Sequence, residues 1–217
     1  MGSFSVREFT IVAFLDIEGA FNNVTSDSIL NALSILDVDC GIQRLIRDLL
    51  TNRRVSGTLG SASLQRFVSR GTPQGGVLSP LLWNLAMNRL LLSLEETKIK
   101  VVAYADDVAI AARGKFPSTL RDIIQRSLRS IEMWAKENGL GVNPEKTEVV
   151  IFSGKKKRPE VRPISLGGMI IPFGDRAKYL GVLLDMKLDF KLNLEERAKR
   201  LLWRFTPVKT RLGNNGV

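Results

Sequence analysis

The sequence predicts an α+β fold in which β-strands pack with helices on one face. Three observations lead to this prediction. Residues 9–17 form an almost continuous apolar and β-rich segment, as expected of a buried central strand. Residues 118–138 have a helical pattern that ends at Asn138-Gly139, a typical C-terminal stop signal. Extended and helical stretches alternate along the chain without internal repeats or low-complexity linkers.

The segments after the first strand each have a boundary signal. The predicted helices cover residues 26–37, 41–52 and 79–96, and two predicted strands cover residues 54–60 and 63–69. Thr25 or Ser26 can cap the first helix. Ser79-Pro80 supplies a cap and a proline at the first position of the last helix. Gly60-Ser61 is the expected turn between the two strands.

An acidic pair interrupts the next apolar region. Residues 98–105 and 108–114 are two extended runs joined at Asp106-Asp107, which predicts a hairpin with both carboxylates at its tip. Ionised carboxylates are costly to desolvate unless a positive charge compensates them, so the pair indicates a cation nearby. Asp16 lies near the end of the first strand and meets the pair if that strand neighbours the hairpin. Taken alone, Asp16 also suits a strand end, and the pair also suits a solvated turn.

After the acidic pair, further strands are predicted over residues 147–153, 161–166, 168–173 and 177–184, and a last helix over residues 190–205.

The C-terminal part of the chain is strongly basic. Lysine and arginine number 17 against 16 acidic residues in 1–152, but 15 against 6 in 153–217. The densest run is Lys155-Lys156-Lys157-Arg158. Nucleic acid would suit this charge because basic side chains neutralise phosphates, and a solvated basic face is the alternative.

The overall composition restricts the chemistry. The 217 residues, 44% hydrophobic and 25% charged, are typical of one large globular domain or of a core with an appendage. The single Cys40 excludes an internal disulfide and a multi-cysteine zinc site. The absence of histidine excludes histidine-based acid–base catalysis within this chain. Any catalysis must therefore use carboxylates, lysine, tyrosine or a hard metal ion.

Five motifs occur in an order that resembles a known family. They are "FLDIEGAF" (14–21), "GTPQGGVLSPLLWNL" (71–85), "YADD" (104–107), "GLGVNPEKTEVVIF" (139–152) and "YLGVLLD" (179–185). In this order they resemble the palm motifs of reverse transcriptases, and their wording most resembles the enzymes of animal non-long-terminal-repeat retrotransposons. The resemblance extends from about residue 8 to residue 205. Group II intron and bacterial reverse transcriptases share the "PQG" and "YADD" features.

The resemblance implies a polymerase palm, an antiparallel sheet with helices packed on one face. Residues 1–185 would form this partial palm, and residues 186–217 would begin a thumb-like helical region. Because Asp16 lies so close to the first residue and a single helix follows the last motif, we expect the fingers to be missing and the thumb truncated.

The resemblance also assigns a metal site to the acidic residues. Asp16 and Asp106 would bind two Mg²⁺ ions, or Mn²⁺ in their place, with Asp107 completing the cluster. The backbone carbonyl of Ile17 would add a further ligand. Two ions held in this way support in-line phosphoryl transfer. This would explain why carboxylates gather in an apolar region.

Other motif residues would contact the nucleotide and the template. Phe21 would press against the sugar of the incoming nucleotide and exclude a 2′-hydroxyl, and a core aromatic is the alternative. Gln74 and Gly75 would lie near the template and nucleotide, in a loop that would otherwise be an ordinary turn. Tyr104 is expected to pack beneath the acidic turn as part of the nucleotide and template site.

Two further roles follow from the last two motifs. Lys146 would protonate or neutralise the leaving pyrophosphate, although a surface lysine at a strand start is an alternative. Leu180 and Gly181 would form a hairpin that grips the primer end. The run Lys155-Lys156-Lys157-Arg158 would contact the nucleic-acid backbone.

The sequence therefore predicts an RNA-directed DNA polymerase palm that adds deoxynucleotides to a DNA primer on an RNA template. If nothing else supplies the fingers, we expect weak or no synthesis by this fragment on its own. The alternative is a non-catalytic, nucleic-acid-binding remnant of a retroelement. No apolar stretch is long enough for a membrane span and no signal peptide is recognisable, so we expect a nuclear or cytoplasmic ribonucleoprotein and no membrane partner.

Overall fold

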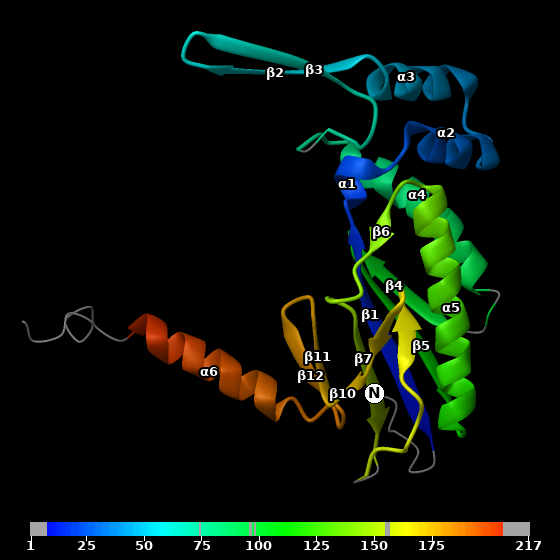
Figure 1. Ribbon diagram of the computed structural model, residues 1–217, viewed down its shortest axis with the longest axis vertical. Coiled ribbons are helices and arrows are strands. Elements are labelled where there is room, and N and C mark those ends of the chain that lie inside the picture. Colours follow the sequence, from blue (N-terminus) through cyan, green and yellow to red (C-terminus); the bar gives the residue numbers. More distant parts are fainter. Residues whose placement is uncertain (1–7, 74, 96, 98, 155–156, 206–217) are drawn as a thin grey trace, which may run out of the picture.

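A central sheet organises the computed structural model, which describes residues 8–205 apart from 74, 96, 98, 155 and 156 (Figure 1). Its strands are β1 (Phe9–Glu18), β4 (Lys100–Tyr104), β5 (Asp107–Gly114), β6 (Gly141–Val142), β7 (Glu148–Ser153) and β10 (Phe173–Gly174). They lie in the order β10-β7-β1-β5-β4, and β6 pairs with the end of β1. Every pairing is antiparallel except that of β10 with β7, which confirms the predicted antiparallel sheet.

Strand β1 is central because it pairs with β5 on one side and with β7 on the other. Successive side chains of a strand point to opposite faces of the sheet. Ile11 and Ala13 are fully buried in the main core, whereas Phe14 belongs to a smaller cluster with Val150 of β7. Both faces of β1 are therefore covered over most of its length, as the continuous apolar pattern predicted.

Helices cover the face of the sheet that carries the main core (Figure 1). They are α4 (Ser79–Glu95) and α5 (Pro117–Glu137), and α1 (Ala20–Asn23), α2 (Ser26–Ile35) and α3 (Cys40–Leu50) lie at one end of the sheet. Thr25 caps α2, because its hydroxyl accepts a hydrogen bond from the amide of Ser28. The helices thus lie on one face, as predicted, and none of them in the described part of the chain is long and apolar enough to span a bilayer.

A hairpin covers part of the opposite face. It consists of β11 (Arg176–Tyr179) and β12 (Val182–Asp185), and Ala177 packs in the smaller cluster with Phe14. The single strand that the residue pattern predicted over residues 177–184 is therefore wrong, whereas the hairpin at Leu180 and Gly181 that the resemblance implied is present. Leu180 and Gly181 both adopt positive φ, 47° and 78°, and form the two-residue turn. This backbone geometry suits a tight hairpin, but leucine rarely adopts it, so the turn followed from the resemblance and not from composition.

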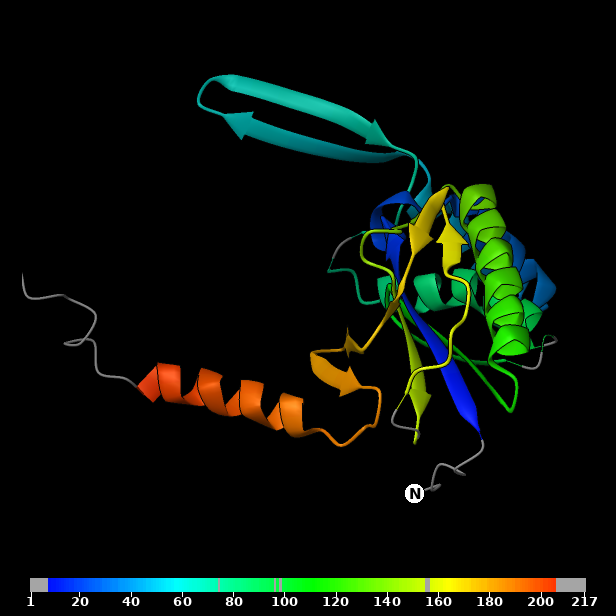
Figure 2. The same cartoon turned by 60° about the horizontal axis from the view of Figure 1, so that its bottom comes forward.

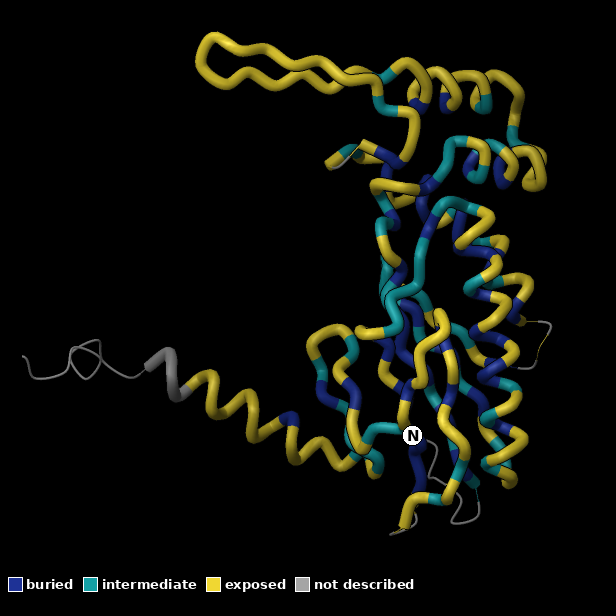
Figure 3. The backbone as a smooth tube through the Cα atoms, in the orientation of Figure 1, coloured by how far each residue is buried: buried dark blue, intermediate teal, exposed yellow. Residues whose placement is uncertain are grey.

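Three segments lie outside the central layers. The hairpin of β2 (Arg53–Leu59) and β3 (Ala62–Val68) projects from the body beside α3, and α6 (Lys191–Phe205) projects from the other end (Figures 1 and 2). Nearly all residues of the β2–β3 hairpin are exposed (Figure 3). The strands β8 (Ile164–Leu166) and β9 (Met169–Ile171) form a short hairpin that α5 holds, since Gln125 exchanges two hydrogen bonds with the backbone of Ser165.

Candidate active site

Two aspartates face each other on the side of the sheet away from α4 and α5. Asp16 lies two positions after Phe14 in β1, and alternate residues of a strand share a face, so Asp16 lies on the same face as Phe14. In the pairing of β1 with β5, Asp16 is directly opposite Asp107. Both aspartates line a cavity of about 180 Å³. The structure therefore brings together two carboxylates that are distant in the sequence.

The acidic turn is held by backbone contacts. Ala105 and Asp106 connect β4 to β5, and Ala105 adopts φ 53°, a left-handed conformation that costs a non-glycine residue about 1–2 kcal/mol. The indole Nε1 of Trp83 donates to the Ala105 carbonyl at 2.8 Å. The amide of Ile17 donates to the Asp106 carbonyl at 3.0 Å. These contacts fix the turn to β1 and α4, and backbone strain of this kind clusters at functional sites.

A lysine lies against the aspartate pair. The Lys146 Nζ donates to an Asp16 carboxylate oxygen at 3.0 Å. The loop before Lys146 is fixed by Asn143, whose side chain accepts from the Lys146 amide and whose own amide donates to the Asp16 carbonyl. The hydrogen bond and the charge of Asp16 raise the pKa of Lys146. The lysine therefore carries a proton at the edge of the cavity.

The charge balance of the cavity favours a further cation. Burial raises the pKa of Asp107, and the neighbouring charges of Asp106 and Asp16 raise it further, against a smaller opposite effect of Lys146. The ionised form of Asp107 is thus disfavoured unless more positive charge arrives. Asp106 acts on this balance from the turn beside the cavity.

The carboxylate oxygens of the cavity suit a hard divalent ion whose remaining ligands come from a substrate. Asp16 and Asp107 offer carboxylate oxygens, and Mg²⁺ typically takes one or two carboxylates together with phosphate oxygens. Among the described residues, no group of three or more aspartate, glutamate, histidine or cysteine side chains is arranged so that it could hold a metal ion without further ligands. The predicted direct metal roles of Asp16 and Asp106, and that of the Ile17 carbonyl, stay predictions.

Two residues that the sequence reasoning missed line the same cavity, Glu148 and Tyr179. Glu148 precedes Val150 by two positions in β7, so strand alternation could have placed it on this face. One of its carboxylate oxygens accepts from the Lys178 amide at 2.7 Å, which ties β11 to β7. Burial, and then the charge of Asp107, raise the pKa of Tyr179.

A comparison with known families now decides the class of protein. A family model described as reverse transcriptase (RNA-dependent DNA polymerase) matches residues 4–184. The chain belongs to the reverse transcriptase family. The match covers the acidic pair, Lys146 and the β11–β12 turn, and it confirms the family that the five motifs indicated.

Relatives of this reverse transcriptase domain occur in insect mobile elements. It is 29% identical over 213 residues to the probable RNA-directed DNA polymerase from transposon BS of Drosophila melanogaster, covering 95% of this chain and 23% of that protein. It is 28% identical over 209 residues to the RNA-directed DNA polymerase from mobile element jockey of Drosophila funebris, and this match covers 93% of this chain and 22% of that protein. The chain spans about a quarter of the length of these relatives. They confirm the resemblance to non-long-terminal-repeat retrotransposon reverse transcriptases.

Solved structures of similar fold come from telomerases. The apo telomerase of Candida tropicalis, truncated from its C-terminal domain, has a TM-score of 0.61 at 12% identity, covering 83% of this chain and 35% of that one. The apo telomerase of the same species has a TM-score of 0.61 at 12% identity, and the match covers 85% of this chain and 32% of that one. At this identity the likeness concerns the fold alone. It supports the predicted palm.

Phe21, one of the predicted nucleotide-site residues of this reverse transcriptase domain, contacts both α4 and the "GTPQGG" loop. The Phe21 ring packs on Trp83 with centroids 5.9 Å apart, and the Phe21 carbonyl accepts from the Thr72 amide at 2.7 Å. The "GTPQGG" loop is thereby joined to α1, the short helix that follows the strand carrying Asp16. In this loop, a Cβ on Gly71 would lie 2.4 Å from the carbonyl oxygen of Asn22, so only glycine fits there.

Three other predicted residues have different outcomes. Gln74 lies outside the described residues, and Gly75 adopts φ 78° in an open position. Tyr104 does not pack beneath the acidic turn, because its side chain is 66% exposed. Trp83 occupies that place instead and supplies the hydrogen bond to Ala105. The nucleotide and template roles of Phe21, Gly75 and Tyr104 stay predictions.

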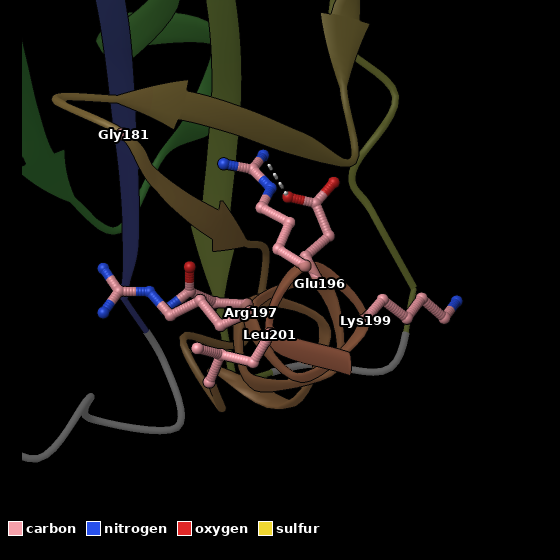
Figure 4. Close-up of a pocket in the computed structure, with 7 residues that line it drawn as sticks. Gly181, Glu196, Arg197, Lys199 and Leu201 are labelled. Atoms are coloured by element: carbon pink, nitrogen blue, oxygen red, sulfur yellow. Dashed lines mark hydrogen bonds and ion pairs between the residues drawn. The ribbon is translucent and has the colours of Figure 1, made fainter. Parts of the chain in front are cut away.

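The predicted primer-end residues lie at the tip of the β11–β12 hairpin. Leu180 is 48% exposed in its strained conformation. Gly181 borders a pocket of about 730 Å³ whose other walls come from α6 (Figure 4). These walls are formed by Asn193, Glu196, Arg197, Lys199, Arg200 and Leu201. Three cations therefore lie on the α6 side of this pocket, where Arg200 is paired to Glu196 and the Lys199 side chain extends away from Gly181 (Figure 4).

The basic run after β7 is only partly described. Lys155 and Lys156 lie outside the described residues, and Lys157 is exposed. The Arg158 guanidinium donates to the Phe173 carbonyl at 2.6 Å and to the Asp175 carboxylate at 3.1 Å. Arg158 thus fixes the segment before β11, and the contact of the whole run with nucleic acid stays a prediction.

Proposed function

We propose that this chain is the palm of an RNA-directed DNA polymerase that transfers deoxynucleotides to a primer 3′-hydroxyl. One observation carries the proposal, the pairing of Asp16 with Asp107 at a cavity that Lys146 also lines. Paired carboxylates beside a lysine suit a reaction in which phosphate oxygens gain and lose negative charge. The chain would therefore contain the chemical centre of the polymerase.

Two divalent ions would be held by Asp16 and the Asp106-Asp107 pair, with the Ile17 carbonyl as a further ligand. Bound Mg²⁺ or Mn²⁺ supplies charge neutralisation and lowers the pKa of a coordinated hydroxyl. The protein side of this proposal rests on the strand register that sets Asp16 opposite Asp107 at the cavity. Burial, and then the charges of Asp106 and Asp16, raise the pKa of Asp107, and bound cations would offset this cost of ionising it.

The chain's own residues would orient the substrates. Lys146 holds a proton at Nζ and would transfer it to, or share it with, the leaving pyrophosphate once the nucleotide replaces its contact with Asp16. Phe21, held on Trp83, would occupy the space of a ribonucleotide 2′-hydroxyl. Gln74, Gly75 and Tyr104 would border the template and nucleotide.

The nucleic acid would be an RNA template with a DNA primer. The Candida tropicalis telomerase in complex with a fragment of telomeric RNA has a TM-score of 0.58 at 12% identity, covering 84% of this chain and 30% of that one. We assign the primer end to Leu180 and Gly181, and the phosphate backbone to Lys155-Lys156-Lys157-Arg158. The palm would comprise residues 1–185 and a thumb-like region would begin at residue 186, within a nuclear or cytoplasmic ribonucleoprotein.

Primer extension by the 217-residue chain tests the proposal. With an RNA template, a DNA primer and Mg²⁺ or Mn²⁺, we expect incorporation that Asp16→Asn lowers by about 10⁴-fold, the scale seen when a catalytic group is removed. Asp48→Asn removes the same charge from an exposed position on α3 and should leave the rate unchanged.

The other outcomes would contradict the proposal. Incorporation that Asp16→Asn leaves intact would place the chemistry elsewhere. RNA binding that weakens with salt, without any metal-dependent incorporation even when fingers and thumb regions are restored to the chain, would instead favour the non-catalytic nucleic-acid-binding remnant.

A further inference from the structure

The β2–β3 hairpin projects from the body of the protein, and nearly all side chains on both of its faces are exposed (Figures 1 and 3). Its charge has a single sign. The sequence has no aspartate or glutamate between Asp48 and Glu95, whereas Arg53, Arg54 and Arg66 lie in the two strands. Surfaces that face only water usually mix charges of both signs. The hairpin is therefore suited to a polyanion, whose phosphates basic side chains neutralise.

The two faces of the hairpin differ in chemistry, because residues directly opposite each other in an antiparallel pair share a face. One face, called here the polar face, carries the pairs Arg54 with Phe67, Ser56 with Gln65, and Thr58 with Ser63. The other face carries the pairs Val55 with Arg66, Gly57 with Leu64, and Leu59 with Ala62. Guanidinium, hydroxyl and amide groups therefore gather on one side of a two-stranded ribbon.

The root of this ribbon is fixed to the body by Arg53. Its guanidinium donates to three backbone carbonyls, at 3.2, 2.7 and 2.7 Å, which belong to Leu50, Arg70 and Gly71. The donors of Arg53 are thus used within the protein. The ribbon extends from this anchor in a defined direction (Figure 2).

The neighbouring Arg54 is arranged differently. Its guanidinium carbon lies 4.9 Å from the centroid of the Phe67 ring, and no oxygen of the described residues accepts a hydrogen bond from it. A guanidinium stacked on an aromatic ring keeps the N–H donors in its plane free for another partner. Arg54 is therefore preorganised for a bidentate contact with two acceptors.

The shape of the ribbon selects the kind of polyanion. A two-stranded ribbon fits the major groove of B-form DNA, which is about 12 Å wide, whereas the major groove of A-form RNA is too deep and narrow to be read by side chains. Arginine, serine, threonine and glutamine are also side chains that form hydrogen bonds with base edges in that groove. The polar face thus combines a suitable shape with a suitable set of donors.

We propose that the polar face of the β2–β3 hairpin lies in the major groove of a B-form DNA duplex, where Arg54 donates to the O6 and N7 atoms of a guanine. The inference goes beyond the proposed polymerase function. It gives the chain a second ligand, a continuous DNA duplex, whose binding requires neither the acid pair nor a primer end.

The test uses a DNA duplex whose two ends are closed by loops, so that it offers no primer end. Its affinity for the 217-residue chain is compared with that of the same duplex containing 7-deazaguanine, which replaces the guanine N7 by a C–H group and leaves every phosphate unchanged. We expect the wild-type chain to bind the guanine duplex about tenfold more tightly, as one bidentate base contact allows. In Arg54→Met, this preference should disappear.

Matched variants separate base reading from general attraction. Arg129→Met removes the same charge from an exposed position on α5 and should keep the tenfold preference. Because Arg54→Met also removes the stacking on Phe67, a second pair of variants adds a charge instead. Ser56→Asp on the polar face should weaken binding at least tenfold more than Val55→Asp, its neighbour on the other face.

Three results would overturn the inference. A wild-type chain that binds the two DNA duplexes equally would contact phosphates alone. An RNA duplex of the same sequence bound as tightly as the DNA would exclude the major groove as the site. Equal weakening by Ser56→Asp and Val55→Asp would show that the polar face has no special role. A chain that prefers the guanine duplex but never extends a primer would contradict the polymerase proposal alone.

Discussion

On one face of the central sheet, Ile11 of β1 and Ile110 of β5 are fully buried under α4 and α5. On the other face, the same two strands present Asp16 and Asp107 to a cavity. The difference arises because neighbouring positions of a strand point in opposite directions. One face therefore stabilises the fold and the other is available for chemistry, and substitutions should separate the two.

The largest effect on stability should come from the covered face. Ile110→Ala leaves a cavity under the helices and should lower the free energy of unfolding by about 2–5 kcal/mol. Chemical denaturation measures this loss. Below the unfolding transition, the variant should keep the wild-type affinity for Mg²⁺, because its side chain lies on the opposite face from the acids. A stable variant that has lost metal affinity would show that the faces are coupled.

A smaller effect is expected from the lysine on the open face. Lys146→Met keeps the aliphatic stem but removes the proton donor next to Asp16, and it should slow nucleotide incorporation by about 100-fold. Single-turnover kinetics at saturating nucleotide measures this step. Lys136→Met, an exposed change at the end of α5, is the matched control. If both variants are equally slow, or equally fast, Lys146 has no role in the chemistry.

The smallest effect concerns pH and the metal-free protein. Folding raises the pKa of Asp107 above its ordinary value of 3.8. As pH rises from 3.8 through the pKa of the folded state, the unfolded chain loses this proton more readily than the folded protein, so the free energy of unfolding falls. Asp107→Asn should therefore raise the melting temperature at neutral pH, by about 1–3 °C because solvent still screens this half-buried charge. The gain should vanish below pH 3.8, where the wild-type carboxyl is protonated in both states.

Melting curves in a chelator between pH 3 and pH 7 measure this dependence. Exposed Asp48→Asn should show no such trend. A stability gain for Asp107→Asn that is the same at every pH would mean that its charge is not the cause.

The sequence predicted the parts of the fold that depend on long periodic patterns. Strand β1 and helix α5 begin and end close to their expected residues, because an apolar run and an Asn-Gly stop are local signals. These features need little information from distant parts of the chain. The meeting of Asp16 with the acidic pair was expected only if the first strand neighboured the hairpin, and the structure sets Asp16 opposite Asp107.

The parts that the sequence did not predict depend on contacts between distant segments. The residue pattern at Leu180 predicted strand because leucine seldom adopts positive φ, and only the resemblance implied a hairpin there. The docking of β11 and β12 on Phe14 offsets the cost of that conformation. Trp83 reaches the acidic turn from a helix, so Tyr104 is left exposed. Tyr179 enters the cavity only after this hairpin folds back, which no local pattern signals.

The β2–β3 hairpin differs from the rest of the molecule in how it can unfold. Within the described residues it pairs with no third strand, and its side chains make few contacts, such as that of Arg54 over the Phe67 ring at 4.9 Å. A lone two-stranded hairpin is marginally stable in water, so it opens far more often than the sheet does. Its amide hydrogens should exchange before those of the central sheet, and trypsin should cut after Arg54 and Arg66 before it cuts within that sheet, while the acid pair stays folded.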